Sequence, residues 1–224
     1  MRIDVFTLFP EWFDWMRRPR HLTQAGLVAG LEIRCFSFRD TSHLPNAQVD
    51  DAPYGGGPGM VIRVDVVAQA FEAVYGQPAE QVREHRRVTV LTPRGAQFTD
   101  AVARDLAVLP ELVLLCGRYE GFDERVHEYL ATDGLCLGPF VLAGGEVAAM
   151  AVIDAVGRRL PGALGNPESL ERESFSEALG GGVEHPHYTR PMQFRGWGVP
   201  EVLRSGDHAA IERWRDERVR PPAG

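Results

Sequence analysis

ELVLLC, residues 111–116, decides the fold, and the stretch after it, GRYEGFDER (117–125), carries the first sign of a ligand site. After Glu111 every residue of the run is apolar, so a strand made from it has no face suited to water. That pattern is typical of a strand inside a parallel sheet that helices cover on both faces. We therefore expect 111–116 to be a sheet strand and 117–125 to be a loop at its carboxyl end.

Strand-like and helix-like segments alternate on both sides of this run. Strands are expected at 2–9, 31–38, 86–92 (ended by Pro93) and 134–138, and the short apolar run 134–138 is expected at the centre of the sheet. Helices are expected at 11–18, 22–29, 64–75, 122–131 and 145–160, and another begins after Thr99, which can cap it. The alternation predicts an α/β domain with a mainly parallel sheet over residues 1–161.

The composition changes after Pro161. Residues 162–180 are rich in Gly, Ser and Glu without a clear period, which is typical of a linker. Residues 181–224 contain one convincing helix, 207–218, with Asp207 as its cap. We expect a small, mostly helical second domain there.

The totals describe a globular protein of 224 residues with a net charge of −7. Its three cysteines form no CxxC pair, no apolar run is long enough to span a membrane, and the N-terminus does not resemble a signal peptide, so we expect a cytoplasmic protein. All 24 basic residues are arginine, and a nucleic-acid site needs a local basic patch. The last part of the chain offers Arg190, Arg195, Arg204, Arg213, Arg215, Arg218 and Arg220.

Three glycine-containing loops, 92–97, 117–125 and 138–146, follow predicted strands. Ligands of open α/β sheets bind at the carboxyl ends of the strands, so these loops predict a binding site. The chain lacks a phosphate-binding P-loop, and the run 55–60 does not match GxGxxG. His185 and His187 are a weak metal-site signal, for which a solvated loop is the simpler interpretation.

Four strings together resemble one family: DDAPYGGGPGM (50–60), CGRYEGFDERV (116–126), GGEVAAM (144–150) and HPHYTRP (185–191). They are similar to the bacterial tRNA (guanine-N1)-methyltransferases, which belong to the SPOUT class of S-adenosylmethionine-dependent enzymes. The resemblance runs to about residue 218. It implies a deep trefoil knot formed by the three loops, which the periodicity does not reveal.

The resemblance also implies where the cofactor S-adenosylmethionine binds. Backbone groups of the three loops would hold it, and glycines there would let the backbone approach it closely. The implied contacts are Leu91, Thr92, Pro93, Gly117, Tyr119, Glu120, Gly121, Leu137, Gly138, Phe140, Leu142, Gly144 and Gly145.

The implied methyl acceptor is N1 of guanosine 37 of tRNA, next to the anticodon. N1 carries a proton at neutral pH, so the reaction benefits from a general base. The family places an aspartate in the linker for this task, and here Glu173 stands in its place, one methylene longer. Arg158 matches the family arginine that would stabilise charge on the guanine. Asp154, four residues earlier, lies on the same helical face and could pair with it.

The string at 50–60 would lie beside the target base, because a flipped base needs a narrow slot lined by backbone. The substrate candidates are Asp50, Tyr54, Gly55, Pro58, Gly59 and Asp154. Tyr54 could stack on the base or pack in the core. Asp50 and Asp51 could read base edges or cap the turn.

Partners follow from the resemblance as well: tRNA, and a second copy of the chain in a homodimer whose active site uses both subunits. Residues 181–224 would be the tRNA-binding domain. Phe6, Phe9, Trp12, Phe13 and Trp15 could serve that interface or the core. The family often uses Mg²⁺, for which no ligand cluster stands out. The chain ends at Gly224, where family members continue, and we expect a weaker grip on tRNA. Two alternatives stay open, namely a knotted methyltransferase for another RNA nucleotide and a catalytically impaired RNA-binding homologue.

Overall fold

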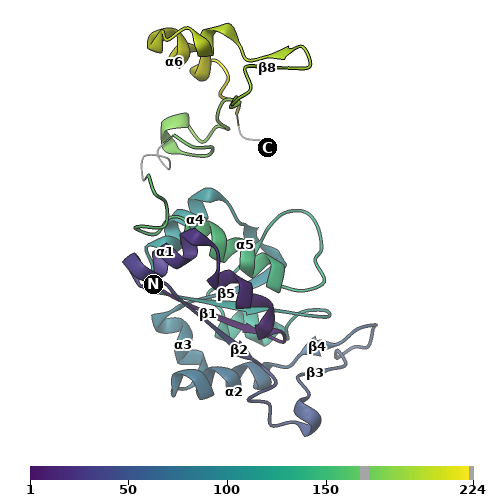
Figure 1. Ribbon diagram of the computed structural model, residues 1–224. Helices are drawn as coiled ribbons and strands as arrows, with labels where there is room; N and C mark the ends of the chain where they lie inside the picture. Colours follow the sequence, from purple (N-terminus) through teal and green to yellow (C-terminus); the bar gives the residue numbers. More distant parts are fainter. Residues whose placement is uncertain (167–171, 222–224) are drawn as a thin grey trace. The chain divides into compact units, whose positions relative to one another are not determined.

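The computed structural model describes residues 1–166 and 172–221, in two compact units, Met1–Gly165 and Asn166–Gly224 (Figure 1). The expected linker, 162–180, falls partly outside the described residues. No helix of the described residues is long and apolar enough to cross a membrane.

The first unit is built on a parallel five-stranded sheet with the order β2-β1-β6-β5-β7. Its strands are β1 (Arg2–Thr7), β2 (Glu32–Ser37), β5 (Arg87–Gln97), β6 (Glu111–Cys116) and β7 (Asp133–Cys136). The α/β class with a parallel sheet is confirmed, and the apolar run 111–116 is the middle strand of the sheet. Residues 112–116 are all fully buried, which explains why the run has no polar face.

Strand alternation directs the buried side chains of the sheet into two clusters, one on each face, beside a small third cluster of Ala25, Leu160 and Ala163. Phe6, Val113 and Leu115 belong to the cluster under α2 (Val64–Tyr75) and α3 (Ala79–His85). Val5 and Leu114 belong to the cluster under α1 (Arg20–Ala29), α4 (Asp100–Ala107) and α5 (Glu146–Gly157). Figure 1 shows the two helix groups on opposite sides of the sheet. The sheet is therefore covered on both faces, and its loops are the part left for a ligand.

Two strand predictions are wrong, and both errors concern β7. The run 134–138 was expected at the centre of the sheet, but β7 is an edge strand that pairs only with β5. Leu135 of β7 is buried in the core, and both Leu135 and the following Leu137 also line a pocket, so the apolar run does not require a strand on each side. Strand β5 was expected to end at Pro93. Its pairing with β7 instead resumes after a register shift, where Ala96 and Gln97 face Leu135 and Cys136.

The helix predictions hold with local differences. Helix α2 has the predicted bounds, and the Thr99 Oγ1 atom accepts a hydrogen bond from Val102 N at 3.3 Å as the cap of α4. The segment 11–18 is a 3₁₀ helix, η1 (Pro10–Arg17), and within 122–131 only residues 124–130 are helical, ending in the π-helical turn η3 (Val126–Leu130). Helix α3 was not predicted, because seven residues carry too little periodicity.

The described residues of the second unit form α6 (His208–Asp216), the 3₁₀ turns η5 (Glu177–Leu179) and η6 (Glu201–Arg204), and a hairpin of β8 (Gln193–Phe194) and β9 (Trp197–Gly198). The expected cap is present, since the Asp207 Oδ1 atom accepts from Ala210 N at 3.0 Å. Trp214 of α6 is the buried anchor of this unit, with the Arg218 guanidinium 4.3 Å from its ring centroid. The hairpin had no signal in the periodicity and was not predicted.

Candidate active site

The three predicted loops converge at the carboxyl edge of the sheet around a pocket of about 240 Å³. The end of β5, the loop after β6 and the loop after β7 each supply a part of its wall. Every residue predicted to contact the cofactor lines the pocket except Gly138. A Cβ on Gly138 would come within 2.9 Å of the Phe140 ring, so this glycine permits the turn that presents Phe140 to the pocket.

Backbone contacts hold the loops together. Gly145 N donates to Gly117 O at 2.9 Å, and Arg118 and Gly144 form an antiparallel bridge. Phe98 N donates to Cys136 O at 2.7 Å. A Cβ on Gly145 would lie 2.7 Å from Cys116 Cα, closer than real Cβ atoms approach. Glycine is therefore required where the two loops cross.

A buried ion pair supports the loop after β6. The Glu146 carboxylate is fully buried at the start of α5, and it accepts from Thr7 Oγ1 at 2.8 Å. Its Oε2 atom lies 3.0 Å from Arg118 Nε. The Arg118 guanidinium also lies 4.6 Å from the ring centroid of Phe9 and 4.9 Å from that of Trp12. A buried carboxylate needs such compensation, so Arg118 ties the pocket loop to the sheet and to η1.

The pocket wall includes residues that sequence reasoning missed, namely Arg94, Arg118, His127 and Cys136. Burial, with Arg94 nearby, lowers the pKa of His127, so the imidazole is held neutral. Arg94 donates to the Glu124 Oε2 atom at 2.6 Å, and this bond lowers the pKa of Glu124. The GRYEG string contains Arg118 and could have found it, whereas His127 lies on a short helical turn without any motif.

The glycine-rich string forms an exposed loop between two short antiparallel strands, β3 (Asp50–Asp51) and β4 (Val61–Ile62). Tyr54 is fully exposed, so the alternative in which its ring packs in the core is wrong. The carboxyl end of this loop approaches the pocket, because Glu120 N donates a hydrogen bond to Met60 O at 3.0 Å. Gly59 has a φ of +87°, and a Cβ there would overlap the Glu120 carboxylate. None of the predicted substrate residues lines the pocket itself.

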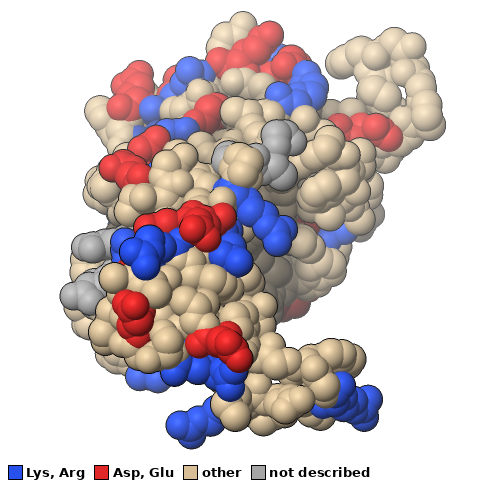
Figure 2. Space-filling view, turned by 90° about the horizontal axis from the view of Figure 1, so that it is seen from above, with Lys and Arg blue, Asp and Glu red and all other residues tan. Residues whose placement is uncertain are grey.

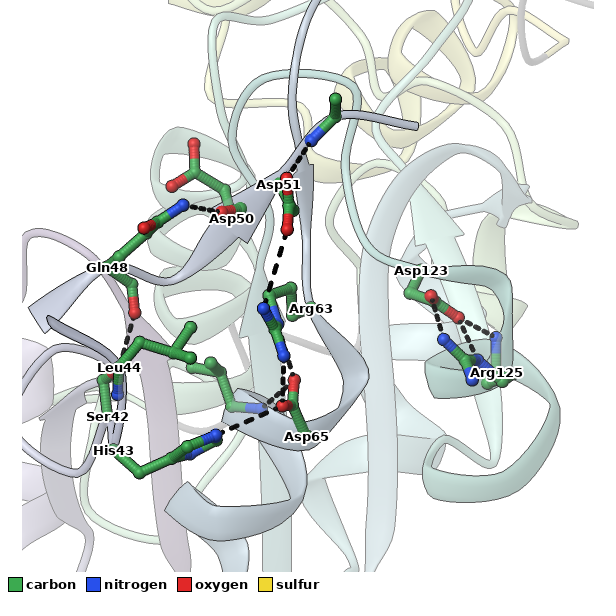
Figure 3. Close-up of polar contacts among 12 residues, drawn as sticks. Ser42, His43, Leu44, Gln48, Asp50, Asp51, Arg63, Asp65, Asp123 and Arg125 are labelled. Carbon is green, nitrogen blue, oxygen red and sulfur yellow. Dashed lines mark hydrogen bonds and ion pairs between the residues drawn. The ribbon is translucent and has the colours of Figure 1, made fainter. Parts of the chain in front are cut away.

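Arg63 holds the base of this loop (Figure 3). Its backbone N donates to Val49 O at 3.0 Å, and its guanidinium donates to both Asp65 oxygens, at 3.0 and 2.7 Å. The same guanidinium lies 3.6 Å from the Asp51 carboxylate. This arrangement lowers the pKa of Asp65. Asp51 also caps the turn, because its Oδ1 atom accepts from Ala52 N at 2.8 Å, whereas Figure 3 shows the Asp50 carboxylate pointing away from the Arg63 side chain.

The predicted catalytic residues lie outside the pocket wall. Arg158 is the C-terminal cap of α5, and Asp154 on that helix has its Oδ1 atom 2.9 Å from His21 Nε2. Glu173 is half-buried in the second unit, where its carbonyl accepts from Ser176 N at 3.1 Å. The structure thus brings together the cofactor candidates and places Glu173 on a separate unit.

Comparison with known proteins shows the family to which this chain belongs. The family model described as tRNA (Guanine-1)-methyltransferase TrmD matches residues 1–221. A tRNA (guanine-N(1)-)-methyltransferase of Dehalococcoides mccartyi is 49% identical over 215 residues, which is 96% of this chain and 84% of the relative. Those of Brevibacillus brevis and Geobacter metallireducens are each 46% identical, covering 96% and 98% of this chain and 85% and 86% of their own. The chain belongs to the tRNA (guanine-1)-methyltransferase family, and its fold is that of the SPOUT class.

Proposed function

We propose that this protein methylates N1 of guanosine 37 in tRNA, with S-adenosylmethionine as the methyl donor. The observation that carries the proposal is the pocket where the three glycine-containing loops converge. It offers main-chain groups and small residues to a ligand, together with the aromatic side chains of Tyr119 and Phe140. These suit a donor with an adenine ring, a ribose and a methionine chain.

The protein's part in the reaction is to align the two reactants and to move one proton. The donor supplies a methyl group on a sulfonium centre. The Glu173 carboxylate accepts the proton of guanine N1, and the N1 lone pair forms the new bond to the methyl carbon while the sulfur–carbon bond breaks. The products are N1-methylguanosine, S-adenosylhomocysteine and a protonated Glu173. The Arg158 guanidinium stabilises the negative charge that develops at guanine O6.

The glycine loop forms the substrate side of the site. Its contact with Glu120 through Met60 and Gly59 supports this assignment, because it joins the loop to the pocket wall. Asp50, Tyr54, Gly55 and Pro58 then face the tRNA, together with Asp154 of α5. The described residues contain no group of three or more His, Cys, Asp or Glu side chains able to hold a metal ion.

We also propose a homodimer. Phe6 and Phe13 are buried in the core, but Trp12 and Trp15 of η1 remain 42% and 48% exposed. Two exposed indoles on one short helix suit a subunit interface. The Trp12 ring also contacts Arg118, which lines the pocket, so such an interface would lie next to the site. Sedimentation of the purified protein tests this, and a monomer at micromolar concentration contradicts it. We also propose a cytoplasmic location, which the proposed tRNA substrate supports.

The trefoil knot is a further part of the proposal. After β7 the chain returns to the end of β6, where Gly145 N meets Gly117 O, and β5 pairs with β7 on both sides of the register shift. These contacts bring the three loops together, as a knot formed by them requires. An experimental structure whose chain trace straightens when both ends are pulled contradicts it.

Methyl transfer to an unmodified tRNA transcript tests the proposed chemistry. We expect Glu173→Gln to lose about 10²–10⁴-fold in rate, as for removal of a general base, and Glu173→Asp to retain activity. Glu177→Gln, an exposed acid nearby, is the matched control and keeps the full rate. An unchanged rate in Glu173→Gln removes Glu173 from the mechanism. Cofactor binding without any transfer by the wild type favours the impaired homologue, and a methyl group on another nucleotide favours the other alternative.

A further inference from the structure

The β8–β9 hairpin of the second unit presents aromatic side chains to solvent. Phe194 is 51% exposed and Trp197 is 70% exposed, with ring centroids 5.8 Å apart and planes at 57°. The ladder has only two residue pairs, Gln193 with Gly198 and Phe194 with Trp197. So short a hairpin is marginally stable in water, and exposed rings bury little surface to help it. The exposed rings of Phe194 and Trp197 therefore indicate that a binding partner covers the hairpin.

The turn of this hairpin has an arginine where the backbone favours another residue. Arg195 has a φ of +48° and Gly196 a φ of +87°. Two consecutive left-handed residues make the turn type that prefers Asn-Gly or Gly-Gly, and an arginine there strains the backbone. Local strain of this kind persists where the side chain has a use. The Arg195 guanidinium lies 5.1 Å from the Phe194 ring centroid, so charge and ring form one exposed surface.

The charge of the surrounding segment is unusual for this protein. The chain has a net charge of −7, but residues 185–200 contain Arg190 and Arg195 without any Asp or Glu. Glu184 and Glu201 flank this segment, and the Glu184 carboxylate lies 2.8 Å from His187 Nε2. Figure 2 shows acidic and basic side chains intermixed over the face it presents. A basic, acid-free segment with exposed rings complements a polyanion that offers unpaired bases.

We propose that the β8–β9 hairpin binds unpaired nucleotides of the tRNA substrate. Trp197 and Phe194 offer their faces to a base, and the Arg195 guanidinium contacts the adjacent phosphate, for which its planar fork is suited. The proposal rests on the proposed function, because it takes the partner to be tRNA. It adds the surface of the second unit that receives the RNA and the chemistry by which it does so.

Arg195→Gly is the sharpest test, because glycine relieves the backbone and removes only the guanidinium. We expect this variant to fold at least as well as the wild type, to bind tRNA several-fold more weakly, and to reduce the salt dependence by about one phosphate contact. Trp197→Ala removes a stacking ring, for which about five- to 150-fold weaker tRNA binding is expected. Arg83→Ala in α3, whose guanidinium donates to Glu128 O, is the matched loss of one exposed charge and leaves tRNA affinity unchanged.

The measurements are tRNA filter binding at several salt concentrations, S-adenosylmethionine affinity by calorimetry, and sedimentation of each variant. Weaker tRNA binding with unchanged cofactor affinity and unchanged oligomeric state supports the proposal. Wild-type tRNA affinity in both Arg195→Gly and Trp197→Ala overturns it. A changed oligomeric state in these variants also overturns it, because the hairpin would then be a contact between protein chains. If the wild type binds tRNA but methylates none, the proposed function fails while a loss of binding in the variants still supports the hairpin.

Discussion

Gly145→Ala tests whether the close crossing of two loops builds the cofactor pocket. Gly145 has ordinary right-handed backbone angles, so the added methyl group brings no backbone strain and acts only through space. It would lie 2.7 Å from Cys116 Cα and must retreat by about 0.7 Å to reach the 3.4 Å at which ordinary contact begins. Neither Cys116 nor the backbone of residue 145 moves easily, because Cys116 is fully buried in β6 and Gly145 N donates a hydrogen bond to Gly117 O.

Overpacking of this kind costs about 1–3 kcal/mol. If the loop after β7 moves away from β6, the pocket deforms and S-adenosylmethionine affinity falls by about five- to 150-fold. If the loop stays in place, the free energy of unfolding falls instead, which lowers Tm by roughly 2–4 °C for each kcal/mol. Calorimetric titration and thermal unfolding together capture both outcomes.

Gly165→Ala is the matched control, since nothing lies within 4 Å of a Cβ at that position. We expect it to leave both cofactor affinity and Tm unchanged. Gly145→Ala with wild-type cofactor affinity and wild-type Tm would refute the reasoning, because the crossing would then be neither tight nor part of the pocket.

Further predictions concern the thiols and the glycine loop. Burial raises the pKa of Cys35 to about 11 and that of Cys116 well above its usual value. We therefore expect iodoacetamide at pH 8 to modify the pocket-lining Cys136 first, and bound S-adenosylmethionine to slow this modification. Equal modification of Cys136 with and without cofactor, measured by mass spectrometry, contradicts this. Arg63→Ala should release the base of the loop, speed chymotrypsin cleavage after Tyr54 several-fold and raise the KM for tRNA, with cofactor affinity unchanged. Because Arg63 holds the pKa of Asp65 below its ordinary 3.8, the Arg63–Asp65 pair is fully formed above pH 3.8 and is lost as the pH falls through the lowered pKa. The ratio of the cleavage rates of Arg63→Ala and wild type should therefore be equal at pH 7 and pH 5.

The features that the sequence predicts well are those with local or continuous signals. The run 111–116 is apolar enough to identify a strand covered on both faces, and Thr99 and Asp207 are side chains whose capping role is local. The cofactor residues depended on the family resemblance, because the loops meet only through long-range backbone contacts such as Gly145 N with Gly117 O. Periodicity within one segment contains no information about such pairs.

The misplaced features have physical reasons of the same kind. The apolar run 134–138 contributes to both the core and a pocket wall, and a single-segment pattern does not distinguish these roles from a position at the centre of the sheet. The β8–β9 hairpin has two residue pairs and a turn without the usual Asn-Gly signal, because Arg195 occupies the left-handed position. Arg118 lay inside a quoted motif, but its role became visible only through Glu146 and the rings of η1.

The most direct test of the account is to map the methyl group after incubation of the wild-type protein with S-adenosylmethionine and an unmodified tRNA transcript that has guanosine at position 37. The account predicts one N1-methylguanosine, at position 37, and none when that guanosine is replaced by adenosine. A methyl group on another nucleotide, or undiminished transfer to the adenosine transcript, would contradict it.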